Sequence, residues 1–326
     1  MKPFENILFV VNPEEPCALV LERTVALAEN NQAALTVVDV LPRLALGAGG
    51  PEAGLTGLEL QAGLAAERGA LLEGLVSPFR ERLPIRTRVL TGTPYLEVVR
   101  EVIRGGHDLV VRPPERPGWL DRLFGSDDMH LLRKCPCPVW LIQCEPPKSR
   151  QRILATVDAD DRYPAEELET RRALNHEVLE RAAALALSEF AELHVASVWD
   201  AMGESLLRGP FENSPEEKIA PYVEHARRRV AANLDQLMLD LEDAFGKETA
   251  QYLRPSVHLV KGSARREIPA LARRLEANLV VMGTVARTGI PGLIMGNTAE
   301  AILEQIGCSV LAIKPPGFVT PVSLQD

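Results

Sequence analysis

Short apolar runs recur along this chain, separated by longer stretches with helical spacing. In the first half the runs lie at 6–11, 35–40, 86–91, 108–112 and 138–143. In the second half they lie at 152–157, 192–198, 256–261, 279–283 and 309–314. Continuous apolar runs are typical of strands covered on both faces, as in a parallel sheet. The pattern therefore predicts strands alternating with helices, an α/β fold.

The two halves repeat these features in the same order. In each half a Gly precedes an apolar run by 16 residues: Gly92 precedes the run that begins at Asp108, and Gly262 precedes the run that begins at Asn278. The offset between the copies grows from 146 residues (6 to 152) to 170 residues (92 to 262). The second copy should therefore have a longer middle, which we expect within residues 200–254.

This repeat predicts two tandem, doubly wound parallel-sheet domains. We place them at residues 1–147 and 148–326. The prolines within 145–150 mark a linker, because successive prolines extend neither a helix nor a strand.

Composition and charge narrow the class of partner. The chain has 326 residues, of which 46% are hydrophobic and 25% charged, and its formal net charge is −9. Neither half has a basic excess, which argues against nucleic acid and an anionic membrane surface as partners. The N-terminal apolar stretch 7–11 is too short for a signal peptide or a membrane span. Five cysteines without paired spacing fit a reducing cytoplasm.

The second copy carries a candidate ligand site. Ligands of doubly wound sheets bind beyond the carboxyl ends of the strands, where Gly283 ends an apolar run. Gly296 precedes a helical stretch that we expect Asn297 or Thr298 to cap, and N–H groups at a helix start suit a phosphate. Asp158, directly after the first run of this copy, can accept hydrogen bonds from a ribose or from the amino group of adenine. Turn glycines, an ordinary N-cap and a turn-forming Asp are the alternative interpretation of these residues.

Several other classes of site find no support in the sequence. There is no dinucleotide fingerprint, no Walker lysine loop and no hydrolase nucleophile elbow. Cys135 and Cys137 are one residue apart, which does not suit a tetrahedral metal site or a Cys-x-x-Cys redox pair. We therefore predict no catalytic residues and no metal ligands.

The stretch 283–298 resembles the ATP-binding signature of the universal stress protein family, Gly-x-x-Gly followed nine residues later by Gly-Ser/Thr. Gly283 and Gly296 fall on its first and third glycines. Ala286 stands where the second Gly belongs, and Asn297 replaces the hydroxyl residue. The segments 130–140, 283–290, 296–300 and 320–324 extend the resemblance to tandem members of this family, almost from end to end.

The resemblance implies the adenine nucleotide α-hydrolase-like fold and a site for ATP or another adenine nucleotide in the second domain. Its implied residues are Val157, Asp158, Val195, Gly283, Thr284, Ala286, Arg287, Gly296, Asn297 and Thr298. It also implies a cytoplasmic stress-response protein, tied to resistance to DNA damage, without a known reaction. In the family the last strand makes the dimer contact, so we expect 138–143 and 309–314 to pair the two halves as an internal pseudo-dimer. A further homodimer is left open.

The first copy departs further from the signature. Pro113 stands where the first Gly belongs, and because proline lacks an N–H, a nest of backbone donors cannot form there. Asn12 and Pro13 replace the Asp. Gly125 and Ser126 remain before the last helix, one residue too early. We predict no nucleotide in this half.

Three functions from different classes follow. The first is a non-enzymatic stress-response protein that binds adenine nucleotide in its second half. The second is a scaffold that binds an apolar small molecule or a protein and no nucleotide. The third, which ranks last because no base, nucleophile or carboxylate pair is apparent, is a slow ATPase or nucleotidyl transferase.

Overall fold

The computed structural model describes residues 4–12, 18–44, 57–114, 126–144, 151–209, 214–284 and 295–324. The chain divides into two compact units. The first contains residues 1–146 together with 309–312 and 318–326, and the second contains 147–308 and 313–317. The last segment of the chain is therefore shared between the units.

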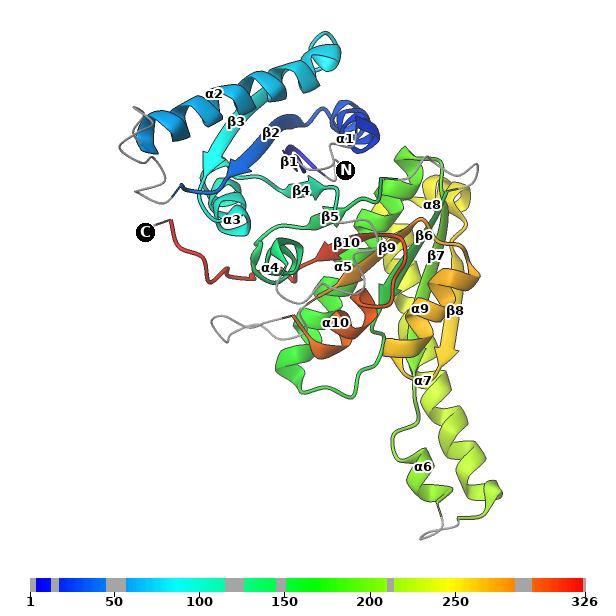
Figure 1. Ribbon diagram of the computed structural model, residues 1–326. Helices are drawn as coiled ribbons and strands as arrows, with labels where there is room; N and C mark the ends of the chain where they lie inside the picture. Colours follow the sequence, from blue (N-terminus) through cyan, green and yellow to red (C-terminus); the bar gives the residue numbers. More distant parts are fainter. Residues whose placement is uncertain are drawn as a thin grey trace. The chain divides into compact units, whose positions relative to one another are not determined.

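The first unit is a mostly parallel sheet with helices packed on it (Figure 1). Its elements are β1 (Asn6–Val10), α1 (Ala18–Asn31), β2 (Ala34–Leu41), α2 (Gly57–Val76), the 3-10 helix η1 (Ser77–Phe79), β3 (Ile85–Thr91), α3 (Pro94–Gly105), β4 (Leu109–Arg112), α4 (Asp127–Lys134) and β5 (Val139–Leu141). The strands β3, β2, β1, β4 and β5 lie in this order and are parallel. The strand β10 (Ser309–Ile313) pairs antiparallel with β5.

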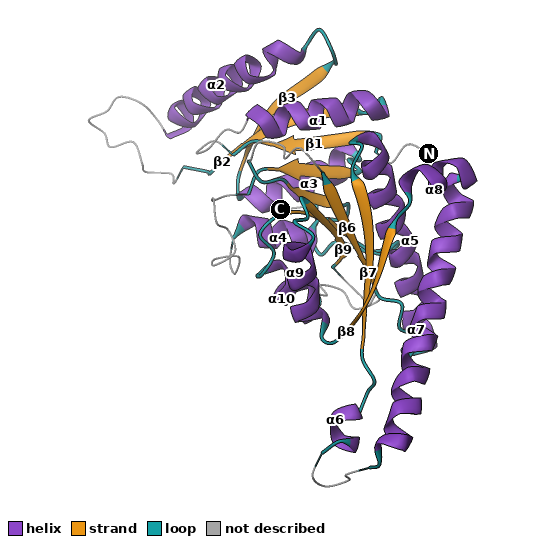
Figure 2. Cartoon of the chain, turned by 90° about the vertical axis from the view of Figure 1, so that its right-hand side faces the viewer, coloured by secondary structure: helices purple, strands orange, loops and turns teal. Residues whose placement is uncertain are grey.

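The second unit repeats this architecture. Its elements are β6 (Arg152–Val157), α5 (Ala165–Ser188), β7 (Glu192–Trp199), α6 (Glu204–Leu207), α7 (Glu216–Phe245), α8 (Lys247–Leu253), β8 (Ser256–Lys261), α9 (Ala264–Arg274), β9 (Leu279–Gly283) and α10 (Asn297–Leu303). The strands β9, β6, β7 and β8 lie in this order and are parallel. In Figure 2, α5 and α7 lie on one side of these strands and α9 and α10 on the other. The α/β fold class predicted from the apolar runs is confirmed.

Burial explains the continuous apolar runs. Five of the six residues of β6 are buried, as are four of the five residues of β9. Strands of this kind must be covered on both faces, which the helices of each unit do. The helix α7 instead has a single apolar face, since its buried residues recur at helical spacing: Ile219, Ala226, Val230, Leu234, Leu237 and Leu241. The longer middle expected in the second copy contains α6, α7 and α8.

One backbone turn occurs at the same place in both units. Gly92 follows β3 with φ 151°, and Gly262 follows β8 with φ 145°, values that L-residues rarely adopt. A Cβ at Gly92 would stand 2.8 Å from Cγ of Glu97, and a Cβ at Gly262 would stand 2.8 Å from Cγ of Glu267. Two glycines 170 residues apart thus meet the same steric demand, as expected of duplicated units.

None of the helices within the described residues combines the length and the apolar character that a membrane span requires.

Candidate functional site

Strand register brings two separate segments of the second unit to one edge of the sheet. The strands β6 and β9 are parallel neighbours, and Thr156 pairs with Met282. Two residues further on, Asp158 stands level with Thr284, just beyond the carboxyl ends of both strands. This is where ligands of doubly wound sheets bind. Val157, the last residue of β6, is buried beneath this edge.

The start of α10 is tied to the end of β9. The N–H of Gly296 donates to the carbonyl of Thr284 at 2.9 Å, so the chain returns to this edge after residues 285–294. Gly296 is the N-cap of α10 and makes no side-chain cap bond. The expectation that Asn297 or Thr298 caps the helix is wrong, because both residues lie inside its first turn. The first N–H groups of a helix have no acceptor within it, and the N-cap here is a glycine, which has no side chain to accept from them.

The side chain of Thr284 turns into the protein. It is 1% exposed, and its hydroxyl donates to the carbonyl of Ile313 at 3.2 Å and accepts from Nζ of Lys314 at 2.9 Å. The backbone of Thr284 is engaged as well, since its N–H donates to the carbonyl of Ile313 at 3.0 Å and its carbonyl accepts from the N–H of Gly296. Thr284 therefore fixes the end of β9 and presents no unused hydrogen-bonding group at this edge.

Gly283 is explained by packing. A Cβ at this position would stand 2.5 Å from Cδ2 of Leu174, a residue of α5. The missing Cβ therefore lets α5 approach β9 closely, and Leu174 fills the space on that side of the strand.

Val195 does not reach the edge. It pairs with Ala155 in the middle of β6 and is fully buried. The β7 residue that stands opposite Val157 is Ser197, whose Oγ accepts from the N–H of Ala159 at 3.3 Å. Ser197 was not singled out in the sequence, although a polar residue within an apolar run is a recognisable signal. Ala286 and Arg287 lie outside the described residues.

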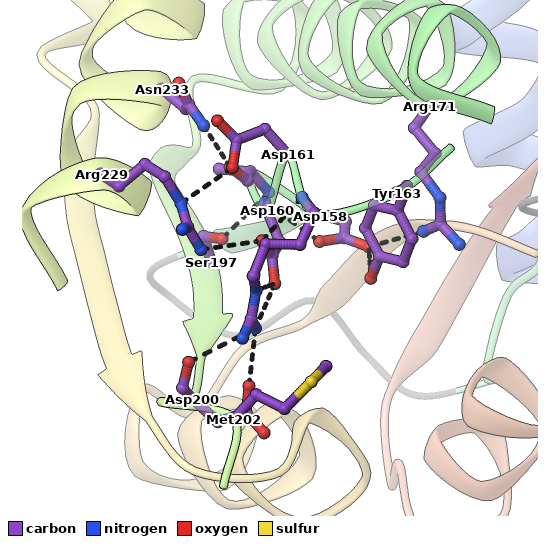
Figure 3. A network of polar contacts seen from close by, with 12 residues as sticks. Asp158, Asp160, Asp161, Tyr163, Arg171, Ser197, Asp200, Met202, Arg229 and Asn233 are labelled. Atoms are coloured by element: carbon purple, nitrogen blue, oxygen red, sulfur yellow. Dashed lines mark hydrogen bonds and ion pairs between the residues drawn. The ribbon is translucent and has the colours of Figure 1, made fainter. Parts of the chain in front are cut away.

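Several residues of the chain hold Asp158 in place (Figure 3). Asn175 of α5 clamps its backbone, accepting from the Asp158 N–H at 3.0 Å and donating to the Asp158 carbonyl at 2.8 Å. The carboxylate oxygen Oδ2 accepts from the hydroxyl of Tyr163 at 2.9 Å and from Nη1 of Arg171 at 2.7 Å. Oδ1 accepts from the N–H of Asp160 at 3.3 Å. We refer to Tyr163 and Arg171 as the Asp158 clasp.

The clasp is compact. The guanidinium carbon of Arg171 lies 3.4 Å from the centroid of the Tyr163 ring, an arrangement that combines a cation with an aromatic face. The pKa of Asp158 is raised, because desolvation by the surrounding protein outweighs the opposing effects of the Arg171 charge and the hydrogen bond from Tyr163. Desolvation and the Asp158 carboxylate raise the pKa of Tyr163, so its hydroxyl remains a proton donor.

An ionic network anchors the loop that follows β6 (Figure 3). Arg162 bridges Asp160 at 2.9 Å and Asp200 at 2.9 Å, the latter directly after β7. Arg229 of α7 contacts Asp160 at 3.5 Å and Asp161 at 2.8 Å. Arg162 lowers the pKa of Asp160 against the opposing effect of its burial. These contacts fix the loop to β7 and α7, and nothing in the sequence pattern indicated them.

Beside this loop, a cavity of about 300 Å³ opens between α5 and α7. It is lined by Asp158, Ala159, Asp160, Asp161, Leu168, Arg171, Arg172, Asn175, His176, Asn233, Gln236, Leu237 and Asp240. Its size is at the lower end of small-molecule pockets. Within the described residues, no group of three His, Cys, Asp or Glu side chains is placed to hold a metal ion.

The corresponding place in the first unit contains an internal ion pair. Arg112, the last residue of β4, contacts Oδ1 of Asp128 at 3.0 Å, and both side chains are buried. Ser126 caps α4 by accepting from the N–H of Met129 at 3.2 Å. A carboxylate of the chain itself thus lies in the first turn of this helix, where a phosphate would otherwise bind.

These features define a protein of tandem α/β units with a candidate ligand site at the edge of one sheet. The universal stress protein family model matches residues 3–143 and 172–314, and the chain belongs to this family. Universal stress protein E of Escherichia coli K12 is 32% identical over 247 residues, which cover 75% of this chain and 72% of that protein.

Other relatives cover nearly the whole chain. Universal stress protein E of Photorhabdus laumondii is 26% identical over 333 residues, which cover 99% of this chain and 98% of that protein. A crystal structure of a putative universal stress protein from Pseudomonas aeruginosa UCBPP-PA14 covers 96% of this chain and 94% of its own, with 25% identity and a TM-score of 0.68. A universal stress protein from Archaeoglobus fulgidus shares the fold, with a TM-score of 0.58 at 16% identity.

Proposed function

We propose that this universal stress protein serves the stress response by binding rather than by catalysis, and that its second unit binds an adenine nucleotide. The observation that carries the proposal is the closure of Gly296 onto Thr284 beside Asp158. It brings the amides at the start of α10, a kind of group that suits phosphate, to the same sheet edge as a carboxylate that suits a ribose or an adenine amino group. The proposed site comprises the residues that the family resemblance implies, with Ser197 in place of Val195 at the level of the edge.

Equilibrium binding of labelled ATP tests this proposal. Asp158→Asn removes the charge of the acceptor while keeping its size, so we expect it to weaken binding. Asp235→Asn, an exposed position on α7, makes the same chemical change away from the site and should leave binding unaltered. Absence of binding by the wild-type chain at millimolar ATP would remove nucleotide binding from the proposed function.

A specific observation favours a second candidate, a scaffold that binds an apolar small molecule or a protein and no nucleotide. Leu174 fills the space beside Gly283, and the clasp already occupies Oδ2 of Asp158. Native mass spectrometry of freshly purified protein separates the two candidates, because a carried nucleotide and a carried apolar compound have different masses.

Catalysis beyond a weak ATPase is not part of the proposal. The acidic residues around Asp158 are engaged by Arg162, Arg171 and Arg229, which leaves them poorly suited to act as general bases. Phosphate release from ATP above a buffer blank, abolished by Gly296→Val, would establish an enzyme instead.

We further propose that the two family domains, placed at 1–147 and 148–326, pair within the chain as a pseudo-dimer. Strand β10 is the last strand of the second family domain along the chain, and it pairs with β5 of the first family domain. This strand pairing supports the pseudo-dimer. A homodimer of the whole chain, a cytoplasmic location and a role in resistance to DNA damage belong to the same proposal. Cell fractionation and survival of a deletion strain after ultraviolet irradiation test the last two.

A further inference from the structure

We propose that Tyr163 is a gate on the nucleotide site of the second unit. Its hydroxyl occupies the oxygen of Asp158 that a neutral donor of the nucleotide would bind, so the nucleotide enters only when Tyr163 leaves. This inference rests on the proposed function and concerns the regulation of the same site.

The contacts show that two donors of the chain already occupy Oδ2 of Asp158. Oδ2 accepts from Tyr163 at 2.9 Å and from Arg171 at 2.7 Å, and Oδ1 accepts from the N–H of Asp160 at 3.3 Å. The carboxylate is nevertheless 39% exposed, so a ligand can reach it from solvent. A ligand donor directed at Oδ2 must therefore compete with one of the two donors of the chain that already bind this oxygen.

Charge decides which of the two partners on Oδ2 leaves. The Arg171 side chain is 14% exposed, and it also lies 3.4 Å from Glu167. Separating it from Asp158 would leave this poorly exposed guanidinium with only the more distant carboxylate of Glu167, which is costly. A ribose hydroxyl or an adenine amino group is neutral, like the Tyr163 hydroxyl, and replaces it as one neutral donor for another. Tyr163 is therefore the partner that is exchanged, and Arg171 stays with Asp158.

The loop allows this exchange without rearranging. Arg162, the residue before Tyr163, is fixed by Asp160 and Asp200, and Pro164, the residue after it, is the N-cap of α5. The loop's ion pairs involve Arg162 and Arg229 and not Tyr163. Rotation of the Tyr163 side chain thus uncovers Asp158 while the backbone remains anchored.

The test compares ATP binding by wild type and Tyr163→Phe in calorimetric titrations. Phe keeps the ring against Arg171 and removes only the hydroxyl that competes for Oδ2. We expect Tyr163→Phe to bind ATP about three- to tenfold more tightly, the factor for one hydrogen bond. Tyr222→Phe is the matched control, since Tyr222 donates to the carbonyl of Met202 outside the clasp. It should leave the affinity unchanged.

Two analogues identify the competing donor. Dideoxy-ATP lacks the ribose diol, and purine riboside triphosphate lacks the amino group of adenine. The gain from Tyr163→Phe should disappear with the analogue that lacks the donor to Asp158. A gain retained by both analogues would overturn the gate, because the hydroxyl would then not compete with either group.

A measurement without nucleotide separates the clasp from the proposed function. The hydrogen bond from Tyr163 lowers the pKa of Asp158, so Tyr163→Phe should shift the carboxyl titration of Asp158, followed by carbon NMR, to higher pH. An unmoved titration would show that the clasp contact is not formed. Wild-type binding that is lost in Asp158→Asn but equal in Tyr163→Phe would overturn the gate alone, whereas no binding by either chain would overturn both proposals.

Discussion

Gly283 lies directly against a buried side chain, so there is no space for a Cβ at this position. A Cβ there would stand 2.5 Å from Cδ2 and 2.8 Å from Cγ of Leu174, closer than real Cβ contacts. Glycine at the end of this strand is thus required by the approach of α5, independently of any ligand. The same motif that indicates a phosphate loop in the sequence also serves the packing of the second unit.

We predict that Gly283→Ala lowers the free energy of unfolding by about 1–3 kcal/mol, the usual cost of overpacking. Gly307→Ala is the control, since a Cβ at Gly307 has nothing within 4 Å, and it should stay within about 0.5 kcal/mol of wild type. Urea unfolding followed by circular dichroism measures both. Combining Gly283→Ala with Leu174→Val should recover part of the loss, and a fully stable Gly283→Ala would contradict the packing explanation.

At the scale of elements, the strands β7 and β8 carry a pair of histidines. Nδ1 of His194 lies 3.1 Å from Nε2 of His258, on neighbouring strands. Burial lowers the pKa of both, and Arg152 and Arg274 add to this while Glu192 opposes it. The lowered pKa values favour the neutral form of both rings, in which one ring can donate and the other accept the hydrogen bond between them.

The sign of the resulting pH dependence follows from these pKa directions. Because the folded pKa values lie below the ordinary value near 6.5, the unfolded chain binds protons first as the pH falls. The histidine pair therefore stabilises the fold above about pH 6.5, and this contribution is lost progressively below it.

We predict that His258→Gln reduces the loss of unfolding free energy between pH 7.5 and pH 5.5, measured by urea titration at each pH. His225→Gln, an exposed position on α7, should retain the wild-type loss. Equal losses in wild type and His258→Gln would show that the pair does not titrate in this range.

The helix α4 in the first unit depends on its internal ion pair. Arg112 and Asp128 are 7% and 2% exposed, so removal of the carboxylate leaves a buried guanidinium without its charge partner. We predict that Asp128→Asn lowers the free energy of unfolding by about 3–5 kcal/mol. Asp127→Asn, in the same helical turn, should cost less than about 1 kcal/mol. Guanidinium unfolding of both variants tests the difference, and similar small losses would contradict a structural role for the pair.

At the scale of the whole molecule, the first unit needs a strand from the end of the chain. Trp140 of β5 pairs with Leu311 of β10, and both side chains are buried. The residues after the last strand also belong to this unit, since Nε of Arg100 donates to the carbonyl of Ser323 at 3.3 Å. An apolar strand without its neighbour presents an open edge, which promotes association.

We predict that residues 1–146 produced alone associate or unfold at lower urea than the full chain, because β5 lacks β10. Light scattering after gel filtration and urea titration measure the two effects. Co-expression with residues 151–326 should restore a single species. A monomeric, cooperatively folded 1–146 would show that β10 is dispensable for the first unit.

Much of the fold could be predicted from the sequence because its signals are local. The run 152–157 coincides with β6, and the run 279–283 coincides with β9. A continuous apolar run is typical of a buried strand, and a glycine spacing that occurs twice indicates a turn that occurs twice. The α/β class, the tandem family membership and the alternation of strands and helices were all available at this level.

The candidate site could be predicted only in part. The sequence brought Asp158, Gly283 and Gly296 forward as a set, and strand register and the Gly296–Thr284 bond do place them at one edge. It predicted Asn297 or Thr298 as the N-cap of α10, one or two residues after the observed N-cap, Gly296. It also named Val195, which is buried in the middle of its strand, whereas Ser197 stands opposite the last residue of β6. The position of a cap and the level of a strand end depend on where the chain turns in space, which residue order does not specify.

By itself, the sequence determined the fold class, the duplication, the family and the segments that carry the candidate site, because each depends on the order and spacing of residues along the chain. Tertiary structure alone decided what surrounds those segments. The closure of Tyr163 and Arg171 over Asp158, the packing of Leu174 against Gly283 and the pairing of β10 with β5 all join residues through side-chain geometry. Such contacts depend on direction and distance, which residue order does not specify.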